Sequence, residues 1–197
     1  MYTRQGYTQS GWAIVENGSK TYDANATYST NADIILYPAW VPNKYTVSYK
    51  KGTGGSGTNT SAQKSHDVTL TLKGAIFTKT GYTQIGWSLS DNGPKNYELS
   101  GSYTDNVSVT LYPAWSANGL NIAYKKDSYS TGTEVTDSKP YDGTVTLRGA
   151  IFTRDGYKQI GWATSSGGAK AYDLNASYSG NSALTLYPVW SGISYEI

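Results

Sequence analysis

Residues 71–87 read TLKGAIFTKTGYTQIGW, and residues 146–162 read TLRGAIFTRDGYKQIGW. The two stretches lie 75 residues apart, and residues 1–12, MYTRQGYTQSGW, carry the end of the same pattern one period earlier. Between residues 41–115 and 116–190, 35 of 75 positions are identical without any insertion or deletion. A fixed period of this length indicates tandem repeats, in which each copy forms one small structural unit.

The register divides the chain into four parts. Residues 1–40 match only the second half of a copy, residues 41–115 and 116–190 are full copies, and residues 191–197 start a further one. We call the first three parts the first, second and third copies. Because the first copy lacks its opening strands, we expect its core to be uncovered.

Apolar residues recur with a period of two. Tyr45, Val47 and Tyr49 alternate with polar residues, and the stretches 70–72 and 107–111 follow the same alternation. Such alternation is typical of half-buried strands. No stretch shows a convincing helical period. The fold class is therefore mainly β, α+β at most, built from small modules of 75 residues with little helix.

The last five residues suggest a mode of assembly. Ile193–Ile197 align with the openings of both full copies, so that Ile197 falls in register with Val47. We expect Ile193, Tyr195 and Ile197 to form an assembly strand that completes the first copy of another subunit, as in other cases of strand addition. Head-to-tail contacts of this kind build a filament unless their rotation closes a ring. The alternative is a fragment cut out of phase from a longer array.

The composition excludes several classes of site. With no Cys and one His, the chain has no disulfide, thiolate metal site or poly-histidine metal site. A net charge of +2 over 197 residues gives no reason to expect nucleic acid, and we expect no cofactor. No apolar run approaches the ~20 residues of a membrane span. The N-terminal residues lack the pattern of a signal peptide, which we interpret as a mature or excised segment, or as another export route.

Aromatic rings dominate the apolar content, with 19 Tyr, six Trp and only two Phe. The Trp residues fall in two fixed registers, so we expect them to form the structural core that replaces disulfides in such small modules. The alternative is a ligand surface on which exposed rings stack on sugars, and for that role the surface residues Tyr129 and Tyr141 are better candidates. The six predicted core residues are Trp12, Trp40, Trp87, Trp115, Trp162 and Trp190.

Three polar patterns have both a chemical and a structural interpretation. The stretch 52–57 fits the G-x-G-x-x-G pattern, but a dinucleotide loop needs a helix after it, and strand-like sequence follows here. His66 aligns with Tyr141, which favours a solvated loop residue over a metal ligand. Carboxylates recur in two registers and could form a general acid/base pair, but turn capping is the interpretation that we favour. They are Asp23, Glu98 and Asp173 in one register, and Asp67 and Asp142 in the other.

Each copy carries Gly-Tyr-x-x-x-Gly-Trp, then Tyr-Asp or Tyr-Glu about ten positions on, then Leu-Tyr-Pro-x-Trp. This combination resembles the Listeria–Bacteroides repeat, which is related to the internalin B-repeat, and it covers nearly the whole chain. The resemblance implies a compact β-grasp-like module found in tandem in large surface or secreted microbial proteins. There it usually serves as a stalk, a spacer or an adhesive segment and not as a catalyst.

The chain departs from the family pattern in two registers. The family usually has an aromatic residue two places after the Tyr, where this chain has Gln9, Gln84 and Gln159. The family usually has Leu-Tyr-Ala, where this chain has Pro38, Pro113 and Pro188. Since Pro cannot donate a backbone hydrogen bond, we expect the last strand of each copy to be an edge strand or bulged.

These observations predict a non-enzymatic extracellular structural protein of the cell surface, with self-association or other surface proteins as its partners. The alternative is an adhesin module that binds a carbohydrate or a host or cell-surface partner. An enzyme is the third hypothesis, and the sequence assigns it no catalytic, cofactor-binding or metal-binding residue.

Overall fold

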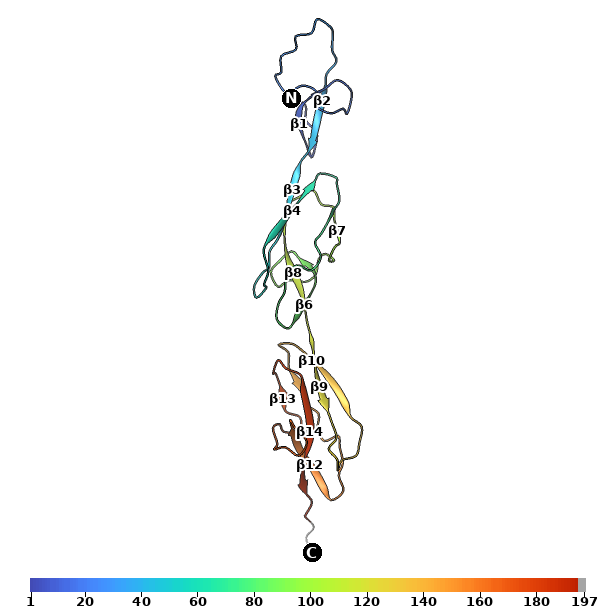
Figure 1. The fold of residues 1–197 in the computed structure, drawn as a ribbon, viewed down its shortest axis with the longest axis vertical. Coiled ribbons are helices and arrows are strands. Elements are labelled where there is room, and N and C mark those ends of the chain that lie inside the picture. The colour runs from blue at the N-terminus through green and yellow to red at the C-terminus, as the bar shows by residue number, and fades with distance from the viewer. Residues whose placement is uncertain (195–197) are drawn as a thin grey trace. The chain divides into compact units, whose positions relative to one another are not determined.

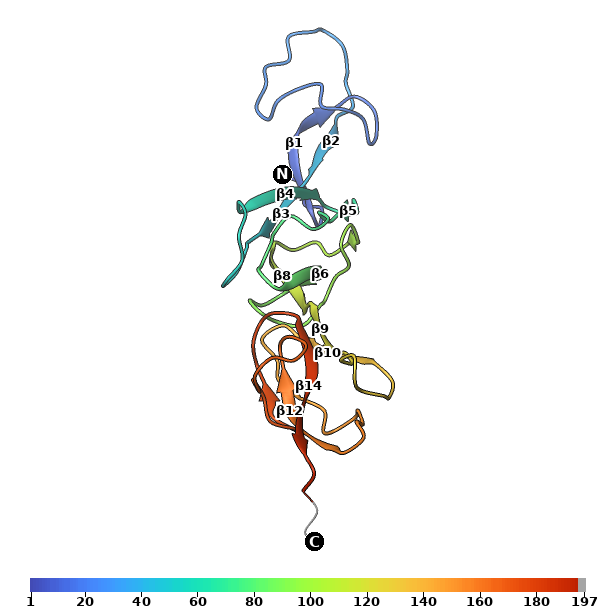
Figure 2. The same cartoon turned by 60° about the horizontal axis from the view of Figure 1, so that its bottom comes forward.

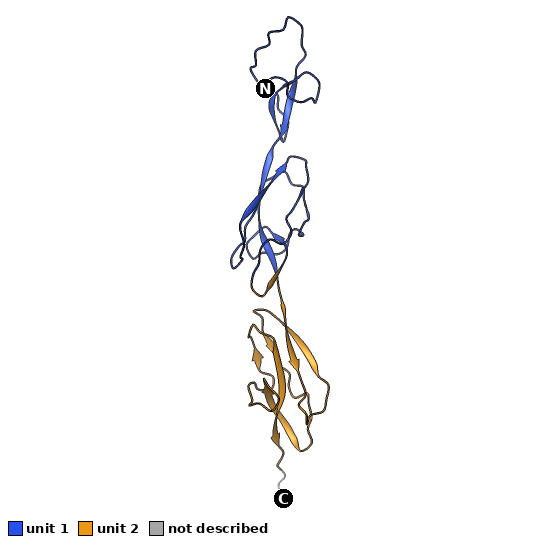
Figure 3. Cartoon of the chain, in the orientation of Figure 1, with its two compact units in different colours: residues 1–79, 84–115 blue, residues 80–83, 116–197 orange. Residues whose placement is uncertain are grey.

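The computed structural model describes residues 1–194 and contains fourteen strands (Figure 1). No helix occurs in these residues, so the predicted mainly-β class is confirmed. The chain forms two compact units, one of residues 1–79 and 84–115 and the other of residues 80–83 and 116–197 (Figure 3). The first and second copies thus share most of one unit, and the third copy lies in the other.

Most of the second copy's strands form one mixed sheet in the order β4-β3-β8-β6. β3 pairs antiparallel with β4 and parallel with β8, where Val47–Tyr49 lie beside Val109–Leu111. A small second sheet pairs β5 with β7 (Figure 2). The strand bounds are β3 Lys44–Tyr49, β4 Thr60–Ser65, β5 Leu70–Thr71, β6 Tyr82–Ser88, β7 Ser102–Tyr103 and β8 Val109–Ala117.

The third copy repeats this topology in the order β10-β9-β14-β12, with a parallel pair of β9 and β14 at the centre. Its small sheet pairs β11 with β13. The β-grasp likeness stays a prediction, since residues 1–194 contain no helix to cover the sheet. The strand bounds are β9 Gly119–Tyr124, β10 Val135–Pro140, β11 Val145–Thr146, β12 Tyr157–Ala163, β13 Ser177–Tyr178 and β14 Leu184–Gly192.

The last strand of each full copy lies inside its sheet and not at an edge, contrary to the expectation from proline. β14 lies between β9 and β12, and its parallel pairing with β9 covers only Leu184–Leu186. Pro188 comes after this pairing, where its missing N–H costs no ladder hydrogen bond on that side. The irregularity lies in the facing strand β12, whose register shifts between Gln159 and Gly161.

One Trp lies at the centre of each complete core. Trp87 and Trp162 are fully buried, and Tyr49 and Tyr124 pack edge-on against them at ring-centre distances of 4.7 and 4.8 Å. Each indole Nε1 donates to a main-chain oxygen, that of Trp87 to Lys73 at 2.8 Å. The indole polar group is therefore satisfied inside the core. The other four, Trp12, Trp40, Trp115 and Trp190, are half-buried.

Two of the Gln residues that depart from the family pattern, Gln84 and Gln159, bind backbone N–H groups at the edge of the core. Gln84 is 6% exposed, and its Oε1 accepts hydrogen bonds from the backbone N–H groups of Ile76 and Phe77 at 3.2 and 3.1 Å. Its Nε2 donates to the Gly86 carbonyl. Gln159 makes the equivalent bonds in the third copy. An aromatic ring in this position could not satisfy these groups.

Candidate functional site

The core of the first copy and a hollow on the third copy are two open regions of the described chain. The first copy contains only β1 (Tyr7–Ala13) and β2 (Tyr37–Pro42), paired antiparallel. In the full copies the corresponding strands β8 and β14 begin at Val109 and Leu184. In the first copy the same register is residue 34, but β2 begins only at Tyr37, so residues 34–36 are not part of the strand. Those three positions are the ones that pair with a parallel strand in the full copies. The first copy therefore loses strand structure where its parallel partner is missing.

The side chains of the first copy show the same loss. Leu36 is 39% exposed, whereas its counterparts Leu111 and Leu186 are fully buried. Tyr28 is 39% exposed against 1% for Tyr103. A cavity of about 270 Å³ results, and apolar side chains of an added strand could fill it. It is lined by Trp12, Tyr22, Asp23, Asn25, Ala26, Tyr28 and Leu36.

Only the start of the predicted assembly strand can be described. Ile193 is 47% exposed, and its N–H donates to the Gly156 carbonyl at 3.0 Å. Asn43 and Asn118 make the same bond to Gly6 and Gly81. Ile193 thus follows the path of a further copy's opening. Tyr195 and Ile197 lie outside the described residues.

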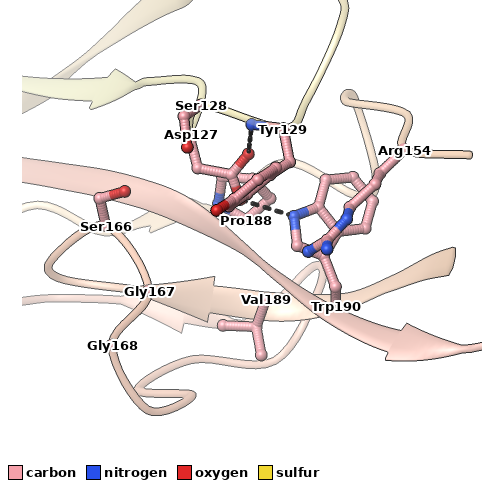
Figure 4. Close-up of a pocket in the computed structure, with 10 residues that line it drawn as sticks. All are labelled: Asp127, Ser128, Tyr129, Arg154, Ser166, Gly167, Gly168, Pro188, Val189 and Trp190. Atoms are coloured by element: carbon pink, nitrogen blue, oxygen red, sulfur yellow. Dashed lines mark hydrogen bonds between the residues drawn. The ribbon is translucent and has the colours of Figure 1, made fainter.

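The hollow on the third copy has a volume of about 300 Å³ and is shown in Figure 4. Tyr129, in the loop between β9 and β10, is 69% exposed at its rim. The half-buried Trp190 of β14 and Arg154, which precedes β12, line it together with the turn 166–168. The Arg154 guanidinium carbon lies 4.7 Å from the Tyr129 ring centre and 3.9 Å from that of Tyr157. The hollow therefore offers aromatic faces beside a cation.

Asp127 fixes the geometry of the hollow. Trp190 Nε1 donates to one of its carboxylate oxygens at 2.8 Å, and the Tyr129 N–H donates to the other at 3.0 Å. Burial opposes ionisation of Asp127, but the hydrogen bonds from Trp190, Ser130 and the Tyr129 N–H, with the charge of Arg154, outweigh it and lower its pKa. Asp127 is thus held as an anion beside two rings.

In the second copy the residues in the register of the hollow bind one another. Thr53 donates its N–H and its hydroxyl to the Asp91 carboxylate, the hydroxyl at 2.6 Å. The hydroxyl hydrogen bond is the main cause that lowers the pKa of Asp91. Gly52 and Gly54 stand where the third copy has Asp127 and Tyr129. The glycine-rich stretch is followed by β4, in agreement with the strand-like sequence after it.

The repeated carboxylates each contact a neighbouring polar residue. Asp23, Glu98 and Asp173 form ion pairs with the Lys three residues before them. Asp67 and Asp142 accept hydrogen bonds from Asn106 and Asn181. Within residues 1–194 no hydrogen bond or ion pair joins the two series, so the structure does not bring them together as an acid/base pair.

The aligned residues His66 and Tyr141 pack on glycines. A Cβ on Gly6 would lie within about 2.0 Å of the His66 ring, and one on Gly81 within 2.2 Å of the Tyr141 ring. Both glycines have φ of +76°, which a residue with a side chain rarely adopts. His66 Nδ1 also lies 3.0 Å from the Tyr45 hydroxyl. His66 is therefore a packing residue, and Tyr141 is half-buried and not a free stacking platform.

Two residues that the sequence analysis missed are the buried lysines Lys64 and Lys139, which are 1% and 0% exposed. A signal was present, because Lys64 shares the inward face of its strand with Ala62 and has Lys139 at its position in the next copy.

A sequence model of the Listeria-Bacteroides repeat domain matches residues 1–38, 45–113 and 121–189. The chain belongs to the Listeria-Bacteroides repeat family. The three matches follow the predicted register, and the resemblance drawn from the motifs is confirmed. The family is defined by a repeated structural module, and membership does not by itself assign a ligand.

Three relatives are similar to this chain. A putative membrane protein of Evansella cellulosilytica is 29% identical over 95% of the chain, and a putative Gly-rich membrane protein of the same organism is 27% identical over 99%. Internalin H of Listeria monocytogenes is 28% identical over 59%. The chain spans 28%, 23% and 20% of the length of these relatives. No solved structure matches the chain.

Across residues 1–194, the structure contains no helix with the length and apolar character needed to cross a bilayer.

Proposed function

We propose that this chain is a non-enzymatic structural segment of an extracellular surface protein. Support comes from its membership of the repeat family and from relatives whose names describe membrane proteins and an internalin. The repeated carboxylates are also engaged by neighbouring Lys and Asn residues, as structural groups usually are. The division of the chain into four parts, after residues 40, 115 and 190, belongs to this proposal, as do the six Trp as core residues.

The finer proposal is head-to-tail assembly through the open core of the first copy. The single observation that carries it is the exposure of Leu36 beside a cavity that the full copies fill with a parallel strand. In this arrangement Ser194–Ile197 of one subunit take the positions of Lys44–Val47, so that Ile197 pairs with Ile34, just before β2 of another subunit. Only Ile197 reaches the parallel pairing, so further contacts between subunits must contribute to the interface.

Sedimentation velocity and negative-stain microscopy of the full chain test this assembly. We expect concentration-dependent filaments from the wild type and monomers after deletion of residues 193–197. Leu36→Asp places a charge in the cavity and is expected to prevent assembly. Ile35→Asp is the matched control, because Ile35 is 71% exposed and does not line the cavity. A wild type that stays monomeric at all concentrations, or a truncated chain that still assembles, contradicts the proposal.

A second candidate function is glycan binding at the hollow on the third copy. It is favoured by the exposed ring of Tyr129 beside the Trp190 indole, with Asp127 and Arg154 available for hydrogen bonds to hydroxyl groups. Aromatic faces with a few fixed polar groups are suited to bind sugars. Arg4, Pro38 and Trp40 line a similar hollow on the first copy, but neither the first nor the second copy has a ring in the register of Tyr129, so one site per chain is expected.

A glycan array followed by titration calorimetry tests the second function. Tyr129→Ala removes the stacking face and is expected to abolish binding, whereas Tyr129→Phe keeps the face and is expected to retain it. Thr53→Ala, in the closed counterpart of the second copy, is the control for loop changes. Absence of binding to any glycan by the wild type contradicts this function.

A further inference from the structure

The buried amine of Lys64 lies against a carboxamide and not against a carboxylate. Lys64 Nζ donates to Asn106 Oδ1 at 2.7 Å and to the Ser65 carbonyl at 3.1 Å. In residues 1–194 no ion pair links it to an acidic side chain. A lysine is rarely buried this completely without an opposite charge beside it. The pair Lys64 and Asn106 therefore requires an explanation.

A carboxylate holds the carboxamide in place from its other side. Asn106 Nδ2 donates to Asp67 Oδ1 at 2.8 Å, and the Asp67 N–H donates to Asn106 Oδ1 at 3.0 Å. The amide is thus bonded at both its nitrogen and its oxygen. The Lys64 amine thus lies at the oxygen of the Asn106 amide, and the Asp67 carboxylate lies at its nitrogen. Groups fixed this closely react much faster than free groups.

We propose that Lys64 and Asn106 become joined by an isopeptide bond within the chain. The neutral Lys64 amine attacks Asn106 Cγ, the new Nζ–Cγ bond forms, and the Cγ–Nδ2 bond breaks. The ammonium form of Lys64 first gives one proton to solvent. A second proton passes from Nζ to the leaving nitrogen, which departs as ammonia. No oxidant or other reactant is needed, and the product is a secondary amide.

Asp67 is the group that can carry the second proton. Its Oδ1 already accepts a hydrogen bond from the nitrogen that leaves. A carboxylate in this position can take a proton from the attacking amine and deliver it to the departing NH₂. Its side chain is 64% exposed, so the proton can also exchange with water.

The third copy provides a comparison inside the same chain. Lys139, Asp142 and Asn181 stand in the same register, and Asn181 makes the same two hydrogen bonds with Asp142. Lys139 Nζ, however, donates to the Pro140 carbonyl at 3.0 Å, and within residues 1–194 no hydrogen bond joins it to Asn181. The first copy has Asn31 in this register without a lysine. We therefore assign the bond to the second copy.

The bond would close a loop inside the second copy. Lys64 is in β4, and Asn106 precedes β8, so the link would tie these strands together across the β3–β8 parallel pair. Residues 65–105 would then be shielded from a pulling force applied at the ends of the copy. A surface protein under tension would gain mechanical resistance from such a link.

Intact mass spectrometry of the full wild-type chain tests the proposal directly. We expect a mass lower than that of the sequence by one ammonia molecule, and digestion should yield a branched peptide that joins Lys64 to Asn106. Lys64→Arg and Asn106→Ala should each restore the full mass, and Asp67→Ala should do so with retained Trp fluorescence. Lys139→Arg is the matched control and should leave the loss unchanged.

Two results would overturn the inference. One is a wild-type chain with the full sequence mass. The other is an ammonia loss that persists in Lys64→Arg, because cyclisation of an Asn with its own backbone releases ammonia without any lysine. Because the wild type itself is measured, failure of a variant to fold does not obscure the answer.

Discussion

The first and second copies carry the same motifs but bury them to different degrees. Trp87 is fully buried against Tyr49 of β3, whereas Trp12 is half-buried and has the exposed Tyr2 ring at 6.0 Å. The difference lies in the opening half of the copy, which the first copy lacks. The hairpin of β1 and β2 forms without it. The motifs of the second half are therefore sufficient for the hairpin, whereas complete burial of the Trp requires the parallel strand of the first half.

The largest expected effect comes from removing the central Trp of a complete core. Trp87→Ala should lower the free energy of unfolding of its unit by ~3–5 kcal/mol, the usual cost of deleting a large buried ring. Trp12→Ala should cost less, because this ring is only half-buried. Chemical denaturation of both variants, followed by circular dichroism, measures the difference. Equal losses would contradict the distinction between complete and incomplete cores.

Adding the missing half is expected to complete the first copy. Residues 41–75, fused directly before Met1, restore the register of a full copy. Hydrogen exchange at residues 34–36 should then slow by about tenfold or more, because these residues gain a parallel partner. As a control, the added segment carries Asp at its Val47 and Tyr49 positions. Unchanged exchange in the fused chain would show that the hairpin does not accept the strand.

The buried glutamine allows a further comparison between the copies. Gln84→Leu should cost ~1–3 kcal/mol, because the buried N–H of Phe77 and the part-buried N–H of Ile76 lose their acceptor. Gln9→Leu should cost less than ~0.5 kcal/mol, since its bond to the exposed Tyr2 N–H can be replaced by water. Thermal unfolding of both variants measures these costs. Similar losses would mean that burial does not determine the role of this position.

The sequence predicts features that depend on local periodicity and fails where distant residues meet. The strand alternation around Val47 and the tandem register follow from local patterns, and the mainly-β class is confirmed. The central position of β14 could not be predicted, because a sheet order with a central parallel pair brings together strands that are far apart in the sequence. The expectation that the strand with Pro188 lies at the edge of its sheet was therefore wrong.

The candidate sites show the same limit. Tyr129 was identified as a surface ring, but its neighbour Trp190 was expected in the core, and the bond between Asp127 and Trp190 spans 63 residues. Lys64 was overlooked because a lysine in a strand usually faces water. The inward register that it shares with Ala62 was the available evidence for its burial.

The smallest expected effect is the pH dependence of the hollow on the third copy. The pKa of Asp127 is lower in the folded chain than its usual value near ~4, so the ionised form stabilises the fold above that pH. This stability is lost as the pH falls through the folded pKa. Asp127→Asn should therefore melt at a lower temperature than the wild type at pH 7, by an amount equivalent to about 1 kcal/mol or less. The two melting temperatures should converge once the pH falls below the folded-state pKa of Asp127.

Asp91 in the second copy sharpens this last comparison, since its pKa is lowered by Thr53 and not by a Trp. Asp91→Asn should show the same direction of pH dependence without any change in Trp fluorescence. Asp127→Asn should alter the emission of Trp190, because the indole N–H loses its charged acceptor. If Asp127→Asn leaves the emission unchanged, the bond between Asp127 and Trp190 does not hold the hollow in shape, and the site for glycans loses its support.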